Sequence, residues 1–326
     1  MKEKEIRDTK VLDRYLELVN EDVKHFFDFN SFINISCPAC SSGKSRREFD
    51  KNGFRYVSCE DCGTLFVNPR PRFEVLKKFY SDSPSTVFWV EQFFKPVAKA
   101  RQEKIFKPRA EYVSGIMGKN KNLTVGDIGA GFGLFLEEWK KIDGGNDYIA
   151  IEPSPKMAET CRGKDIEVRC ACLEELDEKK DRFDVLTAFE LMEHLFNPED
   201  FIRRAWALLK PKGCLVITTL NGRGFDILNL WEKSRSITPP HHLNFFNTNS
   251  IRMLLERSDF TIDEVSTPGK LDWDIMENVI CNEGVDAGKF WDYFAQFADA
   301  PVKAELQDWI ARNRLSSHMR VIARKP

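Results

Sequence analysis

A glycine-rich turn is the first stretch whose residue types and spacing could do chemistry. Asp127–Gly133 has the sequence DIGAGFG. It overlaps the end of a predicted strand, Leu123–Ile128, and precedes a segment whose apolar residues recur at helical spacing. Alternating glycines let the backbone turn tightly and let a ligand lie almost against it. The helix N-terminus that follows offers unpaired N–H groups and the positive end of a helix dipole. The pattern predicts a strand, a turn and a helix that together bind a ligand.

A carboxylate at the end of the next apolar strand narrows the ligand class. Tyr148–Ile151 is a short apolar run that ends in Glu152, where a carboxylate can accept hydrogen bonds from both ribose hydroxyls of a nucleoside. Leu134 stands where the dinucleotide fingerprint G-x-G-x-x-G has its last glycine, so a pyrophosphate is less expected than a nucleoside without one. S-adenosylmethionine fits that description. The alternative is a glycine-rich turn with an unrelated exposed glutamate.

Two C-x-x-C pairs form the second chemical pattern: Cys37, Cys40, Cys59 and Cys62. At this separation four thiolates can close tetrahedrally on one Zn²⁺, and the segment between the pairs, with Asn52-Gly53 at its centre, predicts a hairpin. We therefore expect a zinc ribbon. Four protein ligands leave no open position, so the metal is predicted to be structural. A redox-active pair is the alternative, but no thioredoxin-like βαβ pattern surrounds these cysteines.

Length and composition limit the number of domains, the kinds of partner and the cellular compartment that can be expected. The 326 residues allow one α/β core with appendages, and a net charge of −2 gives no basic excess that would indicate nucleic acid. No apolar run approaches the ~20 residues that cross a bilayer, and the N-terminus lacks a signal-peptide pattern. We therefore expect a cytoplasmic protein, without membrane or nucleic-acid partners, whose nine cysteines are reduced.

The order of motifs resembles that of the class I S-adenosylmethionine-dependent methyltransferases over roughly residues 120–265. The stretches that carry the resemblance are the glycine turn, Glu152, FDVLTAFELMEHLFNP (183–198), LLKPKGCLVITTLN (208–221) and PPHHLNFF (239–246). The family implies a Rossmann-like seven-stranded sheet with the last strand antiparallel. It also implies a cofactor site, for which we predict these residues: Asp127, Gly129, Ala130, Gly131, Glu152, Pro153, Cys172, Leu173, Phe189, Glu190 and His194. Cys172 departs from the acidic residue that many members place against the adenine amino group. His194 has a structural alternative, as a hydrogen-bonding residue near the cofactor.

The cysteine pairs and the VNPRP segment that follows them narrow the resemblance to bacterial methyltransferases of sugars and other small molecules, including nucleotide-sugar C-methyltransferases. Those enzymes carry a Glu-His pair where this chain has His241-His242, so His242 keeps the base position and the carboxylate is replaced. A histidine titrates near neutral pH and can remove the proton of an acceptor that attacks a methyl sulfonium. The loss of the carboxylate favours O-methylation over C-methylation. The alternative is that both histidines cap a turn after Pro239-Pro240.

The predicted organisation has four parts. Residues 1–72 contain an N-terminal helix and the zinc ribbon. Residues 73–118 form a helical linker whose aromatic residues either cover the cofactor or pack in the core. Residues 119–265 form the methyltransferase core, with a lid at 221–247, and residues 266–326 form a helical extension that ends in a strand. The helical span 285–313 is expected to pack on the core or on a second copy of the chain in a homodimer. The expected substrate is a sugar or nucleotide-linked metabolite, and the other functions considered are RNA methylation and a catalytically silent scaffold that binds S-adenosylmethionine.

Overall fold

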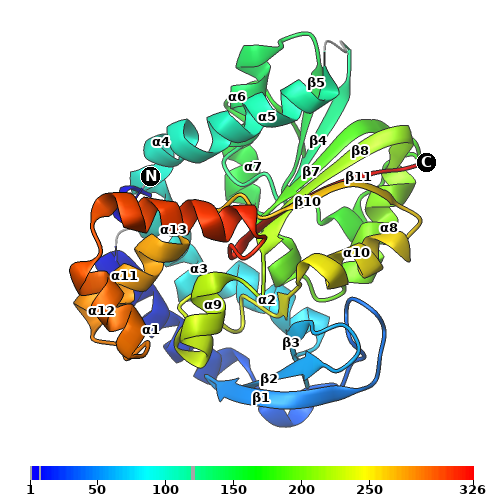
Figure 1. Cartoon of the computed structure of the whole chain (residues 1–326). Helices are drawn as coiled ribbons and strands as arrows, with labels where there is room; N and C mark the ends of the chain where they lie inside the picture. The colour runs from blue at the N-terminus through cyan, green and yellow to red at the C-terminus, as the bar shows by residue number, and fades with distance from the viewer. Residues whose placement is uncertain (1, 7–8, 119–121) are drawn as a thin grey trace. The chain divides into compact units, whose positions relative to one another are not determined.

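The computed structural model describes residues 2–6, 9–118 and 122–326, and the chain divides into two compact units (Figure 1). The ribbon unit consists of the chain up to Phe93 together with Thr219–Ile251 and Ser266–Arg320. The sheet unit consists of Phe94–Thr218, Arg252–Val265 and Val321–Pro326. Each unit therefore combines segments that are far apart in the sequence, and the whole of the predicted lid, 221–247, belongs to the ribbon unit.

A seven-stranded sheet with the order β10-β11-β8-β7-β4-β5-β6 is the frame of the sheet unit. Its strands are β4 (Thr124–Ile128), β5 (Asp147–Ile151), β6 (Glu167–Arg169), β7 (Phe183–Phe189), β8 (Leu209–Leu220), β10 (Thr261–Ser266) and β11 (His318–Arg324). Strands β4 to β8 pair in parallel. β11 runs antiparallel to β8, because Lys212 donates its N–H to Lys325 at one end and Asn221 donates to Ser317 at the other. The predicted Rossmann-like sheet is confirmed.

Helices cover both faces of this sheet because its central strands are apolar on both sides. α5 (Lys107–Met117), α6 (Leu134–Ile142) and α7 (Pro155–Arg162) lie over one face, and α8 (Pro198–Leu208) and α10 (Thr248–Glu256) over the other (Figure 1). On the α6 face, Phe135 and Trp139 are buried in one cluster with Val125 and Ala150. Each such side chain contributes about 1.5–3 kcal/mol by its burial.

Two predicted element boundaries are wrong. From the sequence, Asp200 is predicted to cap the helix after β7, because the apolar positions of that helix begin at Phe201. Asn197 is the cap instead: its side chain accepts the N–H of Asp200, so the helix begins earlier, at Pro198. From the sequence, Lys210-Pro-Lys-Gly213 is predicted to end the helix, and the fifth strand to span only Cys214–Thr219. β8 instead begins at Leu209, because Lys212 and Gly213 form backbone hydrogen bonds with Lys325, which only the tertiary fold brings alongside.

The ribbon unit contains a smaller, four-stranded sheet with the order β1-β2-β3-β9. β1 (Ser45–Lys51) and β2 (Phe54–Cys59) form the predicted hairpin, whose turn residues Asn52 and Gly53 have φ of +48° and +81°. β3 (Leu65–Val67) pairs with β9 (Asn244–Phe245), which comes from the distant segment that follows the two histidines. The ribbon and the histidine segment thus share one sheet.

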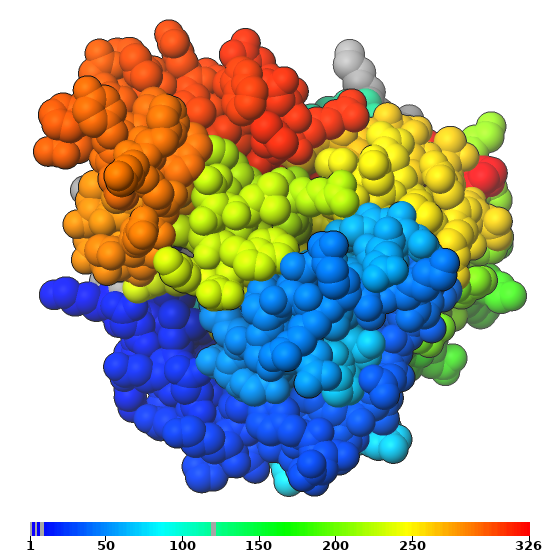
Figure 2. Space-filling view, turned by 60° about the horizontal axis from the view of Figure 1, so that its bottom comes forward, coloured from blue at the N-terminus to red at the C-terminus, as the bar shows by residue number. Residues whose placement is uncertain are grey.

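Helices make up the rest of the ribbon unit. They are α1 (Thr9–Phe26), α2 (Phe73–Asp82), α3 (Pro84–Phe88), α9 (Phe225–Leu230), α11 (Asp272–Glu283), α12 (Lys289–Phe297) and α13 (Ala300–Arg312). Segment 219–247 lies beside the hairpin (Figure 2): Lys51 Nζ donates to Ser234 O over 2.8 Å, and the rings of Phe49 and Trp231 are 5.4 Å apart. Over the described residues, no helix is both long enough and apolar enough to cross a bilayer.

Proline positions organise the predicted helical linker. The sequence predicts that Pro84, Pro96 and Pro108 break the helices of this linker. Pro84 lies in the first turn of α3, after the non-helical cap Ser83, where its missing N–H costs no intrahelical bond. Pro96 and Pro108 are instead the second residues of α4 (Lys95–Arg101) and α5, and each of these helices directly follows a π-helical segment, Trp89–Phe94 and Gln102–Phe106. The break expected at these two prolines is therefore wrong, because the backbone before each of them is already helical.

Candidate functional site

The glycine turn leaves β4 at the carboxyl end of the parallel strands, which is where such sheets bind ligands. Gly129, Gly131 and Gly133 have φ of +70°, +56° and +69°, a left-handed conformation that side chains disfavour. A Cβ placed on Gly131 would meet no heavy atom within 4 Å, so the space beside this residue is open. The turn therefore fits a ligand lying against its backbone, as an adenosine requires.

Glu152 ends β5 and faces this turn. Its side chain is buried, and its carboxylate accepts the N–H of Gly131 and the N–H of Ser154, each over 2.8 Å. Burial raises the pKa of Glu152, and the two backbone hydrogen bonds oppose that rise. The carboxylate is thus held in one orientation next to the glycine turn, as a group that binds ribose hydroxyls must be.

Asp127 lies at the same edge, inside the sheet unit. Its Oδ1 accepts the hydroxyl of Thr187 over 2.6 Å, a bond between the neighbouring strands β4 and β7. Burial raises the pKa of Asp127 to about 7, with the Thr187 hydrogen bond and the charge of Arg109 opposing the rise. The side chain of Asp127, the first residue of the glycine turn, therefore ties β4 to β7.

Glu190, just after β7, is part of a polar network that the sequence analysis did not identify. Its Oε1 accepts from Arg109 Nη2 over 2.6 Å and from the Thr218 hydroxyl over 2.8 Å. The Arg109 guanidinium lies over the Phe189 ring, 5.0 Å from its centre. Arg109 is 81 positions from Glu190, and no local spacing pointed to it. The pair places a cation and a carboxylate beside the ends of β7 and β8.

The other predicted cofactor residues lie along the same strand ends. Ala130 packs against the buried cluster that Phe189 also contacts, and Pro153 follows Glu152 directly. Cys172 begins the short 3₁₀ turn Leu173–Glu175, in which the Leu173 side chain is buried. His194 closes another 3₁₀ turn, its N–H donating to Leu191 O. Their contact with a cofactor stays a prediction.

The aromatic residues of the linker divide between the two units. In the ribbon unit Trp89 and Phe93 stack on one another, and Tyr15 of α1 packs 4.9 Å from the Trp89 ring. In the sheet unit Phe94 lies 5.1 Å from Phe132 of the glycine turn. Phe94 is therefore the linker residue that adjoins the cofactor turn within its own unit.

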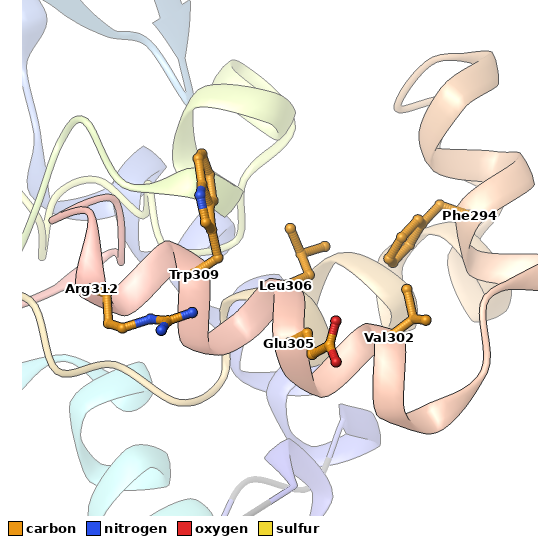
Figure 3. A pocket seen from close by; sticks show the side chains of 6 residues that line it. All are labelled: Phe294, Val302, Glu305, Leu306, Trp309 and Arg312. Atoms are coloured by element: carbon orange, nitrogen blue, oxygen red, sulfur yellow. The ribbon is translucent and has the colours of Figure 1, made fainter.

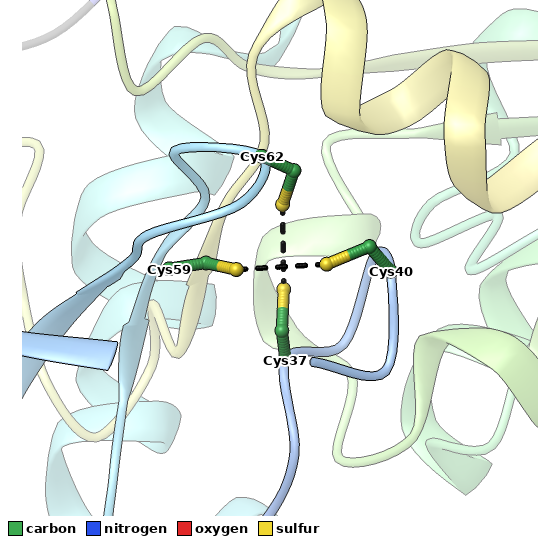
Figure 4. A group of neighbouring side chains, drawn as sticks. All are labelled: Cys37, Cys40, Cys59 and Cys62. Carbon is green, nitrogen blue, oxygen red and sulfur yellow. Dashed lines mark hydrogen bonds between the residues drawn. The ribbon is translucent and has the colours of Figure 1, made fainter. Parts of the chain in front are cut away.

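The four predicted zinc ligands come together in the ribbon unit (Figure 4). Their sulfur atoms point to one centre, and all four lie within 4.8 Å of one another. Cys37 and Cys62 are 3.5 Å apart, as are Cys40 and Cys59. A tetrahedron with Zn–S bonds of about 2.3 Å has sulfurs roughly 3.8 Å apart, so the donor set fits one zinc ion.

The two cysteine pairs lie in two separate backbone turns of the same kind. Each pair is followed by a residue with positive φ, Ser41 at +59° and Gly63 at +70°, whose N–H donates to the carbonyl of the first cysteine. A hydrogen bond from Cys37 lowers the pKa of Cys62 to about 5, and a bond from the Thr64 hydroxyl acts in the same direction. The two turns therefore direct the four sulfurs to one point, as a tetrahedral zinc site requires.

The histidine pair lies in the ribbon unit, directly before β9. His242 Nδ1 is 2.5 Å from Ser236 O, and the His242 carbonyl accepts the hydroxyl of Tyr56. Because a carbonyl oxygen can only accept, Nδ1 carries the proton in the neutral ring, which makes Nε2 the basic nitrogen. The geometry therefore fixes the tautomer that a general base needs.

His241 has different surroundings. It is 7% exposed, and its ring lies 4.9 Å from Phe79, 5.5 Å from Tyr80 and 5.6 Å from Tyr15. These contacts resemble core packing more than an acid/base site. Of the two histidines, His242 is the better candidate for chemistry.

Comparison with known proteins agrees with this geometry. The family model described as "Methyltransferase domain" matches residues 97–265, just over half of the chain. That range includes the glycine turn, Glu152 and both histidines.

Curated relatives match over shorter stretches. A ubiquinone biosynthesis O-methyltransferase of Bradyrhizobium diazoefficiens is 36% identical over 105 residues, covering 30% of this chain and 40% of that protein. Its namesake from Rhodopseudomonas palustris is 34% identical over 122 residues, covering 36% and 46%. The chain thus spans less than half the length of these relatives.

Two solved structures share the fold. A chain from the complex of the Haloferax volcanii Trm112 methyltransferase activator with a methyltransferase has a TM-score of 0.52 at 15% identity, covering 73% of this chain and 96% of that one. Geranyl diphosphate methyltransferase in complex with S-adenosylmethionine has a TM-score of 0.50 at 13% identity, covering 72% and 90%. With the family match over 97–265, the strand order and the glycine turn, this protein belongs to the methyltransferase-domain family and has the Rossmann-like methyltransferase fold.

Proposed function

We propose that this methyltransferase methylates a hydroxyl group of a small polar molecule, a sugar or a nucleotide-linked metabolite, and that His242 is the general base. The observation that carries the proposal is the hydrogen bond between His242 Nδ1 and Ser236 O, which leaves Nε2 as the basic nitrogen of the ring. A hydroxyl is a weak nucleophile until its proton is removed, so a base with this tautomer suits O-methylation.

The chain's own residues have separate tasks in this reaction. Gly129 and Gly131 would hold the adenosine against bare backbone, and Glu152 would accept hydrogen bonds from its ribose. When bound, S-adenosylmethionine supplies an electrophilic methyl group on a sulfonium. His242 would take the proton of the acceptor hydroxyl onto Nε2, and the Ser236 carbonyl would stabilise the imidazolium through Nδ1–H.

In this proposal the zinc ion has a structural role. Four cysteines fill a tetrahedral zinc site, so the ion has no position left for a substrate. The ribbon strand β3 pairs with β9 immediately after the histidines, and Asn247 Nδ2 donates to Cys62 O over 2.9 Å. The folded ribbon would therefore hold the backbone that carries His242.

The names of the curated relatives favour a second candidate acceptor, a ubiquinone precursor. Both relatives described above are named ubiquinone biosynthesis O-methyltransferases. Their aligned stretches are shorter than the methyltransferase domain itself, so they support O-methylation more directly than they support the acceptor. Sugar and ubiquinone-type acceptors are therefore tested side by side.

The test is transfer of isotope-labelled methyl from S-adenosylmethionine to a panel of nucleotide sugars, free sugars and dihydroxybenzene compounds, with NMR of the product to locate the methyl group. We expect O-methylation of one class. His242→Asn should lower turnover by about 100-fold or more, while the affinity for S-adenosylmethionine measured by calorimetry stays the same. His25→Asn, at an exposed histidine of α1, is the matched control.

Four results would contradict parts of the proposal. Unchanged turnover in His242→Asn would remove the assigned base. A C-methylated product would exclude O-methylation, and tight, salt-sensitive RNA binding would favour an RNA methyltransferase. Binding of S-adenosylmethionine without methyl transfer to any acceptor of the panel would favour a catalytically silent scaffold that binds the cofactor.

A further inference from the structure

A self-complementary stripe of side chains runs along the exposed face of α13 in the ribbon unit. It consists of Val302, Glu305, Trp309 and Arg312, spaced by three, four and three residues, all of which are exposed. This spacing places the four on one side of the helix, as the a and d positions of a heptad repeat are. The opposite side of α13 is anchored in the protein by Ile310, which is fully buried.

The stripe borders a shallow, open depression (Figure 3). A cavity of about 510 Å³ is lined by the stripe together with Leu306 and with Phe294 of α12. Phe290 extends this surface along α12, since its ring stacks on Phe294 at 6.1 Å. Trp309 is 50% exposed and Phe290 66% exposed. Large apolar side chains gathered in this way mark interaction sites in soluble proteins.

The charges of the stripe indicate which partner fits it. Glu305 and Arg312 have opposite signs and lie seven residues apart, about 10.5 Å along the helix axis. In the described part of the chain neither forms an ion pair; Arg312 Nε donates to the carbonyl of Asp308, one turn earlier in the same helix. A partner surface should therefore offer a cation and an anion with the same separation and the reverse order.

A second copy of α13 meets that requirement. When two α13 helices run antiparallel about a two-fold axis next to Trp309, Glu305 of each faces Arg312 of the other. Such an interface is isologous, so each complementary pair occurs twice. The two Trp309 side chains then lie near the axis, at the centre of the contact, where aromatic residues contribute most to affinity.

We infer that α13 forms the interface of a homodimer, in which antiparallel α13 helices pair Glu305 with Arg312 of the other copy and bury Trp309 at the two-fold axis. This inference is independent of the acceptor and of His242. It requires only that the stripe is exposed and that Glu305 precedes Arg312 along α13.

Sedimentation velocity of the full-length protein over a range of concentrations tests the inference. We expect the native chain to dimerise. Glu305→Arg and Arg312→Glu should each raise the dimer dissociation constant by at least about tenfold, because each places like charges opposite one another twice. Trp309→Ala should weaken the dimer similarly. Glu111→Arg changes an exposed residue of α5 by the same charge and should leave the dimer unchanged.

The decisive experiment mixes the two single variants. Glu305→Arg carries two cations in the stripe and Arg312→Glu carries two anions, so the mixture should form heterodimers although each variant alone is weakened. The double variant E305R/R312E should regain the native dissociation constant. The inference is overturned if the native chain is still monomeric at about 100 μM, a concentration at which a dimer with a Kd of about 1 μM would be almost fully formed. It is also overturned if the single variants dimerise normally, or if mixing them restores no dimer. Melting temperatures like that of the native chain will establish that the variants are folded.

Discussion

The backbone nitrogen of Gly131 lies 2.8 Å from Oε2 of Glu152, which ties the turn after β4 to the end of β5. The same carboxylate accepts the N–H of Ser154 through its other oxygen. A carboxylate has about four acceptor positions, so these two bonds orient it and leave capacity for ribose hydroxyls. The residue pair therefore connects the loop that would carry the cofactor with the group that would recognise its sugar.

Glu152→Gln should weaken S-adenosylmethionine binding by about 10- to 100-fold. The amide keeps the size of the side chain but loses the charge and one acceptor oxygen, and hydrogen bonds to charged groups are worth about 1.5–3 kcal/mol. Titration calorimetry measures the change. Glu159→Gln alters an α7 side chain that is 76% exposed and should bind like the native chain. Equal affinities for both variants would exclude Glu152 from the cofactor site.

Gly131→Ala should impair cofactor binding more than stability. Its methyl group would enter open space, at a cost of about 1 kcal/mol for the positive φ. Gly126→Ala is the opposite case: its methyl group would lie 2.7 Å from Leu186 and 2.9 Å from Phe183, so overpacking should cost about 1–3 kcal/mol of folding free energy.

Urea unfolding and calorimetry on both glycine variants separate the two effects. The expected result is a large loss of cofactor affinity in Gly131→Ala and a large loss of stability in Gly126→Ala. Native affinity in Gly131→Ala would mean that the space beside this residue does not hold the ligand.

Asp127→Asn should become more stable than the native chain as the pH rises. The pKa of Asp127 is raised from 3.8 to about 7, chiefly by burial. Between these values the unfolded chain has released the proton that the folded chain still holds, so this group's contribution to stability is full below about pH 4, falls through the window and is lost above about pH 7. At about 1.4 kcal/mol per pKa unit the difference reaches about 4 kcal/mol at most.

The measurement is urea unfolding of both proteins at pH 4.5 and pH 8. Asparagine can still accept the Thr187 hydroxyl, so the variant keeps that bond. Asp147→Asn, at an exposed carboxylate, controls for the loss of one charge. An equal pH dependence in Asp127→Asn and the native chain would show that Asp127 does not titrate in this range.

Cys62→Ser should remove zinc from the purified protein and destabilise it. The native chain should contain one zinc per chain by elemental analysis, and the variant far less, because serine is a poor zinc ligand at neutral pH. Since metal binding contributes directly to the folding of such sites, the melting temperature should fall as well. Cys281→Ser, at an exposed cysteine outside the cluster, should keep both properties. A native chain without zinc would contradict the metal assignment.

Much of the fold could be predicted because its signals are local. β4, β5 and β7 are short apolar runs between turn residues, and the Asn52-Gly53 turn favours a hairpin whatever surrounds it. The cysteine spacing likewise brings two pairs of sulfurs together through short turns. The start of α8 was missed by three residues because Asn197 and Asp200 are both good capping residues, and only the backbone geometry distinguishes them.

The sequence by itself determined the type of sheet, the cysteine cluster and the place of Glu152 beside the glycine turn, since periodicity and spacing encode contacts within one strand–turn–helix unit. Tertiary structure alone decided the Arg109–Glu190 pair, the joining of β9 to the ribbon, and the hydrogen bond from Tyr56 to His242, 186 positions away. Such contacts depend on the order and direction of the strands in each sheet. The local periodicity of the sequence does not indicate which distant residue will contact a given side chain.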